Sequence, residues 1–240
     1  VIMNTSTATP FLSGVDLIFT IKEKQKKIQT GRSSFSFVNE REIETKQEKG
    51  YQEKMNAVYI TSDSKEKNAL QRFSEIVIRK KENAILSALQ KIDDRIISIL
   101  PLPDGLYLNH ADFEELVPSN IAGDGIRRYL NIVTTVAEKP NSIILIDEIE
   151  NGLHFSAHIS LWLSILSLCK DLNIQLFITT HNIETIKHFS EALENEKLHS
   201  LQGKSKAYSL VHTKNEGIKA YSYSYESFKN ALEFENEIRN

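Results

Sequence analysis

The sequence of 240 residues has few of the features that mark several protein classes. It has one cysteine, Cys169, in an apolar stretch, so a disulfide framework is excluded and we expect a small buried side chain in a reducing cytoplasm. Its apolar runs are all shorter than the roughly 20 residues that span a bilayer, and no signal peptide is evident, so we expect no membrane segment. Lys and Arg number 29 against 32 Asp and Glu, so any contact with DNA would need a local basic patch.

A further absence concerns nucleotide chemistry. The phosphate-binding pattern G-x-x-x-x-G-K-[ST] does not occur in the sequence. Gly203-Lys204-Ser205 matches its last three residues, but Leu198 stands in place of the first glycine and the sequence that follows is strand-like, whereas a phosphate loop opens a helix. We therefore reject this tripeptide as a phosphate loop. The chain starts at Val1 and not at methionine, and we interpret it as a fragment whose upstream part carries the missing loop.

The most informative run is S-I-I-L-I-D-E-I-E-N-G-L-H, residues 142–154. Four apolar residues suit a short strand that is buried on both faces, as in a parallel sheet. Asp147 and Glu148 then lie at the C-terminal end of that strand, where open α/β sheets bind ligands. Taken alone, the run is equally compatible with a buried strand that ends in a solvated acidic turn.

Two neighbouring motifs make the nucleotide interpretation more specific. Residues 174–181 read I-Q-L-F-I-T-T-H, which predicts a second apolar strand that ends in a histidine. Upstream, residues 122–128 read A-G-D-G-I-R-R and predict a glycine-rich turn that opens a helix. A glycine-rich turn, an acid-tipped strand and a histidine-tipped strand in this order are more specific than any one of them.

From about Gly105 to the C-terminus, the chain resembles the C-terminal half of a bacterial ABC-type ATPase head. The group is that of the RecF-like and OLD-like AAA ATPases, which includes abortive-infection toxins. In this resemblance G-D-G-I-R-R takes the place of the ABC signature, L-I-D-E-I-E is Walker B, E-N-G-L-H covers the D-loop and T-T-H-N carries the switch histidine. The resemblance implies an α/β P-loop NTPase core with parallel strands flanked by helices, an antiparallel edge hairpin and an N-terminal β-hairpin and helical appendage. It divides the chain into residues 1–104 and 105–240.

The resemblance also implies roles for individual residues. Asp147 would hold Mg²⁺, and Glu148 would act as the general base or position the attacking water. His181 would donate a hydrogen bond to the γ-phosphate of ATP. A structural acid pair and a core or capping histidine are the alternatives.

A further set of residues would contact nucleotide or cross a dimer interface. These are the signature residues Gly123, Asp124, Gly125 and Arg127 and the D-loop residues Asn151 and His154, with Arg128 adding charge at the signature. The alternative for the signature is an ordinary glycine turn at a helix start, and its A-G-D-G core has no serine hydroxyl for the phosphate. His154 and His158 have a metal-like i, i+4 spacing, but no third ligand lies nearby in the sequence, so we do not expect zinc.

Two functions remain open at this point. The first is ATP binding and hydrolysis by a dimeric head, completed by a Walker A segment that this chain lacks, in DNA transactions or phage defence. The second is a truncated or split half that does not bind ATP alone and serves as an interaction module. The expected partner is accordingly a second copy or another ATPase half, with DNA as a further possibility.

Periodicity predicts the other elements. Residues 14–22 and 33–38 alternate and predict an antiparallel hairpin, whereas 40–54 mixes charges and predicts a mobile loop or solvated arm. We expect a short strand over 57–61 and a terminal hairpin over 207–211 and 218–223. The expected helices are one through Leu70, Phe73, Ile76 and Val77, one striped by Ile85, Leu89, Ile92, Ile96 and Ile99 and closed by Pro101, and three over 126–137, 156–170 and 183–193.

Overall fold

The structure is a computed structural model that describes residues 14–21, 29–39, 42–47, 56–61, 69–213 and 217–233. The chain divides into two compact units, Val1–Lys54 with His212–Lys219 and Met55–Val211 with Ala220–Asn240. The predicted parts, 1–104 and 105–240, follow the extent of a sequence resemblance rather than compactness, and that division stays a prediction.

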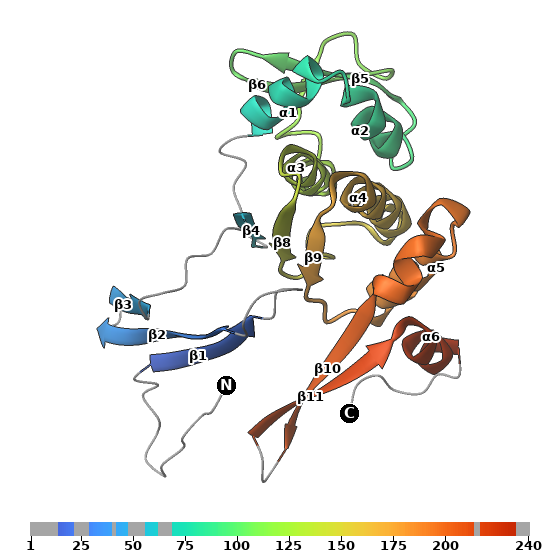
Figure 1. Cartoon of the computed structure of the whole chain (residues 1–240). Coiled ribbons are helices and arrows are strands. Elements are labelled where there is room, and N and C mark those ends of the chain that lie inside the picture. The colour runs from blue at the N-terminus through green and yellow to red at the C-terminus, as the bar shows by residue number, and fades with distance from the viewer. Residues whose placement is uncertain are drawn as a thin grey trace. The chain divides into compact units, whose positions relative to one another are not determined.

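The first unit contains an antiparallel sheet of three strands in the order β1-β2-β3, drawn in blue in Figure 1. The strands are β1 (Gly14–Ile21), β2 (Gln29–Asn39) and β3 (Glu42–Gln47). The predicted hairpin is confirmed. The prediction of a loop over 40–54 is wrong for Glu42–Gln47, because β2 offers a second edge with which these residues pair, Thr45 opposite Phe35. The other residues of the predicted loop, 40–41 and 48–54, lie outside the described residues.

The centre of the second unit is a parallel sheet in the order β4-β8-β9. The strands are β4 (Asn56–Ile60), β8 (Ser142–Ile146) and β9 (Gln175–Ile178), and the predicted parallel layer is therefore confirmed. Helices α3 (Asp124–Glu138) and α4 (His158–Leu172) lie side by side over this sheet (Figure 1). Ile144 and Ile146 of the middle strand are buried in the same core as residues of both helices.

A smaller layer packs on α3 and consists of two helices and an antiparallel sheet in the order β5-β6-β7. Its elements are α1 (Ala69–Ile78), α2 (Glu82–Leu89), β5 (Ile96–Leu102), β6 (Gly105–His110) and β7 (Val117–Pro118). The prediction of one helix from Ile85 to Ile99 is wrong, because the second half of that stripe pairs with β6 as a strand. Ile96 and Ile99 are buried on this strand on either side of a bulge, which reproduces a helical spacing.

The remaining elements come after Glu148 in the chain. They are η1 (Phe155–Ala157), α5 (Ile183–Leu193), η2 (Glu196–Lys204), β10 (Lys206–Thr213), β11 (Gly217–Ser224) and α6 (Tyr225–Glu233). The three helices predicted over 126–137, 156–170 and 183–193 are confirmed as α3, α4 and α5. Strands β10 and β11 pair as a two-stranded sheet. Gly203 and Lys204 end η2 and lead into a strand, which agrees with their rejection as a phosphate loop.

Two predictions about single features can be checked here. Cys169 is buried, and burial raises the pKa of its thiol to about 12, so it behaves as the small hydrophobe that was predicted. None of the helices among the described residues is both long enough and apolar enough to cross a bilayer.

Candidate functional site

Asp147 and Glu148, the acids of the predicted Walker B motif, lie at the C-terminal end of the middle strand of the parallel sheet. The backbone N–H of Asp147 donates to the carbonyl of Ile60 at 3.0 Å, and the N–H of Thr179 donates to the carbonyl of Ile146 at 3.0 Å. These bonds continue the ladders beyond β8 on both sides. Asp147 is therefore held between the ends of its two neighbouring strands.

Thr179 connects both acids. Its hydroxyl donates to Asp147 Oδ1 at 2.5 Å and accepts from the backbone N–H of Glu148 at 3.0 Å, because a hydroxyl can do both. The Asp147 carboxylate and the Thr179 hydroxyl thus present oxygen ligands side by side. Such hard oxygen donors fit Mg²⁺, which binds through one or two carboxylates together with phosphate oxygens and water.

Glu148 has a strained backbone, with φ at 45°. Side chains with a Cβ rarely adopt this left-handed region, and strain of this kind is concentrated at functional sites. The carbonyl of Glu148 accepts from the N–H of Asn151 at 2.9 Å and closes a tight turn. The strain accompanies the abrupt change of direction from the strand into the D-loop.

Tyr59 of β4 is a neighbour of Asp147 that the sequence did not reveal. Its pKa is raised, first by partial desolvation and then by the charge of Asp147 and a hydrogen bond with it. The strand register explains the proximity: Tyr59 lies opposite Leu145, and Leu145 and Asp147, two residues apart, point to the same face of the sheet. Only the pairing of β4 with β8 could have identified this contact.

The glycine-rich turn opens α3, as predicted. Gly123 has φ at 107°, a conformation that favours glycine, and it immediately precedes the first helical residue. Asp124 and Arg127 are exposed and form an ion pair of 2.6 Å on the first turn. A Cβ placed on Gly125 would lie 3.4 Å from the carbonyl oxygen of Gly152, so the signature turn and the D-loop are in contact.

Arg128 differs from its sequence interpretation as a surface charge. Its side chain is buried, and its guanidinium donates to the carbonyls of Thr61 at 2.5 Å and of Asp147 at 3.2 Å. It therefore joins the signature helix to the ends of β4 and β8. A role of Arg128 in charging the signature surface does not agree with this burial.

The D-loop residues Asn151 and His154 are exposed, and the His154 ring lies 4.3 Å from the ring of Phe155. His158 is buried at the start of α4, so these two histidines differ in environment. The residues that the structure describes contain no group of three His, Cys, Asp or Glu side chains placed to hold a metal ion.

His181 follows β9 on an exposed segment, and its backbone N–H donates to Glu150 Oε1 at 2.9 Å. Asn182 caps α5 with its side-chain oxygen on the N–H of Glu184 at 2.9 Å. His181, the predicted switch histidine, thus lies between the end of β9 and the start of α5.

Residues 19–187 match the family described as "AAA domain, putative AbiEii toxin, Type IV TA system". The chain belongs to this AAA domain family. A relative from Helicobacter pylori (strain ATCC 700392 / 26695), named "ATP/GTP phosphatase", is 32% identical over 148 residues. The match covers 59% of this chain, which spans 40% of the length of that relative.

Solved structures show the same type of fold. The structure of an Smc head bound to the C-terminal winged-helix domain of ScpA is similar with a TM-score of 0.52 at 11% identity, over 91% of this chain and 76% of that one. The Smc head domain of Thermotoga maritima has a TM-score of 0.48 at 9% identity, over 89% and 76% of the two chains. The AAA domain family and the similarity to the ScpA-bound Smc head together show that the chain has the P-loop NTPase fold of ABC-type ATPase heads, as the sequence predicted.

Within the AAA domain, the structure brings together some of the predicted residues and adds others. Asp147 and Glu148 share Thr179, and Gly125 contacts the D-loop at Gly152. His181 is linked to the Walker B segment through Glu150. Thr179 and Glu150 belong to the predicted motifs, but the sequence alone indicates no role for either residue.

Proposed function

We propose that this chain is the part of an ABC-type ATPase head that carries the catalytic acids, and that the completed head binds ATP with Mg²⁺ and hydrolyses it as a dimer. One observation supports this most strongly: Asp147, Glu148 and Thr179 meet at the C-terminal ends of two adjacent parallel strands. Ligands bind at this edge in open α/β sheets.

In the proposed reaction Asp147, beside the Thr179 hydroxyl, holds the metal ion. When bound, Mg²⁺ neutralises charge on the β- and γ-phosphates. Glu148 accepts a proton from a water molecule while the oxygen of that water bonds to the γ-phosphorus. The bond from the γ-phosphorus to the ADP oxygen breaks at the same time, and ADP leaves. His181 donates a hydrogen bond to a γ-phosphate oxygen.

The proposed dimer uses the surface formed by the signature turn and the D-loop. Gly123, Asp124 and Arg127 are exposed on the turn, and Asn151 and His154 are exposed on the D-loop. The contact of Gly125 with Gly152 joins both segments into one surface. The N–H groups at the start of α3 would face the nucleotide held by the opposite subunit.

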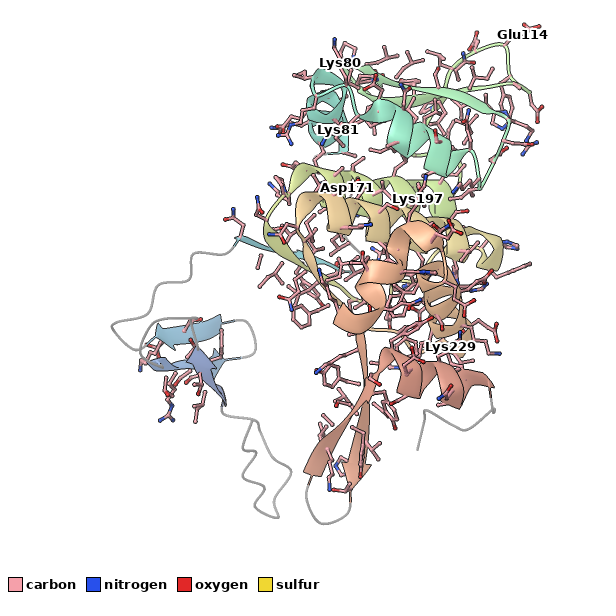
Figure 2. The ribbon with its side chains drawn as sticks, turned by 45° about the vertical axis from the view of Figure 1, so that its right-hand side comes forward. Lys80, Lys81, Glu114, Asp171, Lys197 and Lys229 are labelled. Atoms are coloured by element: carbon pink, nitrogen blue, oxygen red, sulfur yellow. The ribbon has the colours of Figure 1, made fainter. Side chains whose placement is uncertain are left out.

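The test is Mg²⁺-dependent ATP binding and hydrolysis by the completed head, that is the purified chain together with a segment that carries a phosphate loop, and by the same head with Glu148→Gln. Glutamine keeps the shape of the side chain and removes its basicity, so we expect hydrolysis to fall by about a hundredfold or more while ATP binding persists. Glu114→Gln is the matched control, since Glu114 lies on an exposed loop of the smaller layer, as Figure 2 shows. Hydrolysis at the parental rate in Glu148→Gln would refute the role of Glu148.

A second candidate function is an interaction module that is inert alone, and one observation favours it. Tyr59, Leu145 and Phe177 form a row across the parallel sheet and are 59%, 37% and 48% exposed. Parallel sheets are normally covered on both faces, so this row suits contact with another polypeptide that completes the head. ATP hydrolysis by the chain together with a segment that carries a phosphate loop would favour the enzyme, and association with that segment without hydrolysis would favour the module.

We propose phage defence or DNA transactions as the biological setting: the family description, which names a toxin, supports the first, and the resemblance of the sequence motifs supports the second. Arg79, Lys80 and Lys81 are exposed at the end of α1, where Figure 2 labels the two lysines. Such a short basic run is usually a solvated surface. Stimulation of hydrolysis by duplex DNA, lost at high salt, is the result that would support a contact with DNA.

A further inference from the structure

A set of hydrogen bonds joins the Walker B turn to the segment that carries His181. The N–H of Glu148 donates to the Thr179 hydroxyl at 3.0 Å, and the N–H of Ile149 donates to the Thr179 carbonyl at 3.3 Å. The next bond along, from the N–H of His181, is accepted by the side chain of Glu150 at 2.9 Å. The carboxylate of Glu150 therefore extends the connection between β8 and β9 past the point where the two backbones separate.

The surroundings of Glu150 restrict its side chain. Its backbone carbonyl accepts from the N–H of Leu153 at 3.1 Å, which fixes the turn that presents it. Its second oxygen, Oε2, is buried and has no hydrogen-bond partner among the described residues. A carboxylate with one buried oxygen has few alternative positions. The His181 N–H that donates to it lies two residues before α5 (Ile183–Leu193), whose N-terminus favours a negative charge.

A pair of histidines, of which His158 is buried and His188 is partly buried, packs where α4 meets α5. His158 of α4 is 4% exposed, and its ring packs edge-on against that of His188 of α5, with centroids 5.6 Å apart. The Glu150 carboxylate acts electrostatically on His158, as does His154. Glu150 thus interacts both with the exposed His181 segment and with His158 at the start of α4.

We infer that Glu150 is a positioning residue for His181: its carboxylate fixes the backbone of the switch histidine relative to Asp147 and Glu148, and so sets where the His181 ring meets the γ-phosphate. This inference rests on the proposed function for its consequence in hydrolysis. The bond itself exists without nucleotide and can be tested separately.

The first measurement is hydrogen exchange of the His181 backbone N–H by NMR in the whole chain without nucleotide. We expect exchange about tenfold faster in Glu150→Ala, because the acceptor is lost, and closer to the parent in Glu150→Gln, which keeps an oxygen acceptor of the same reach. Glu114→Ala is the matched control and should not change it. Unchanged exchange in Glu150→Ala would overturn the inference whether or not the chain hydrolyses ATP.

The second measurement is ATP hydrolysis by the same variants under the conditions in which the parent is active. Glu150→Ala should lower kcat about tenfold or more and leave KM for ATP within about threefold, because Asp147 is untouched. Glu150→Gln should restore most of kcat. Equal loss of kcat in the two variants, with the His181 N–H still protected in Glu150→Gln, would overturn positioning through this bond.

The two proposals can fail separately. If the parent hydrolyses no ATP, the exchange measurement still decides whether Glu150 holds His181. If Glu150→Ala does not fold, as fluorescence of the buried Trp162 would show, Glu150→Gln and Glu150→Asp replace it. The shorter aspartate should then expose the His181 N–H, and continued protection would contradict the inference.

Discussion

Glu148, the proposed general base, has an unfavourable backbone conformation. Its φ of 45° is sterically disfavoured for a residue with a Cβ and costs about 1–2 kcal/mol. The same turn allows its N–H to reach the Thr179 hydroxyl and its carbonyl to accept from Asn151. The conformation that places the Glu148 carboxylate at the end of β8 therefore lowers the free energy of unfolding.

Glu148→Gly should consequently be more stable than Glu148→Ala, while both variants should lose hydrolysis. Glycine relieves the left-handed strain but gains freedom in the unfolded chain, so the expected net gain over Glu148→Ala is about 0.5–1 kcal/mol. Urea denaturation followed by the fluorescence of Trp162, the single tryptophan, measures the difference. A glycine variant less stable than the alanine variant would show that the turn is not strained in solution.

The sequence predicted the residues that belong to compact motifs and missed those that depend on pairing. Asp147 and Glu148 follow an apolar run, so their place at the end of a strand could be predicted from the pattern, and their roles stay predictions. Tyr59 lies 88 positions before Asp147, and only the register of β4 with β8 brings them together. Arg127 and Arg128 were both expected to add charge at the signature, but a helix turns successive side chains to different faces, and only Arg127 is exposed.

At the scale of elements, β5 shows why a periodic stripe can mislead. Ile96 and Ile99 are both buried although they are three residues apart, which in a regular strand would place them on opposite faces. The pairing shifts between Ile96 and Ser98, and this bulge turns both isoleucines towards the core. The helical stretch ends at Leu89, and in the segment before β5 the Arg95 guanidinium bonds the Asp93 carboxylate and lowers the pKa of Asp93 to about 2.

The contact between α4 and α5 depends on a neutral histidine. His158 Nδ1 lies 3.5 Å from the Thr185 hydroxyl, and Trp162, one turn later, donates to the Thr185 carbonyl at 3.0 Å. Burial first, and then the neighbouring His188, lower the pKa of His158 below its ordinary 6.5, while the Glu150 carboxylate acts in the opposite direction. The folded chain therefore binds this proton less readily than the unfolded chain does.

The free energy of unfolding should then decrease as the pH falls below about 6.5, the ordinary pKa of the group. Above that pH the contribution is fully present, and below it the unfolded chain takes up a proton that the folded chain resists, at most about 1.4 kcal/mol per pH unit. Urea denaturation between pH 7.5 and 5.5 should show a smaller slope in His158→Gln than in the parent. His212→Gln, at an exposed position on β10, is the control, and equal slopes in His158→Gln and the parent would contradict the argument.

At the scale of the whole molecule, the motif order in the sequence was sufficient to predict the parallel layer, since strand, helix, strand, helix requires right-handed crossovers. The order β4-β8-β9 was not predictable, because β4 is short and is separated from β8 by the smaller layer. That order places β8, which is followed by Asp147 and Glu148, between β4 and β9, the outer strands of the described sheet. It also assembles the row of Tyr59, Leu145 and Phe177 from three distant segments.

This row allows a prediction about association. If it meets another polypeptide, Leu145→Lys should leave the free energy of unfolding of the chain within about 0.5 kcal/mol, because an exposed side chain contributes little to a folded monomer. The same change should weaken association, measured by sedimentation at increasing concentration, because a charge would be buried at the contact. Ile78→Lys is the matched control, since Ile78 is 79% exposed at the end of α1. A loss of stability in Leu145→Lys without any change in association would mean that the row is covered within the chain itself, and the sheet would then need no partner on that face.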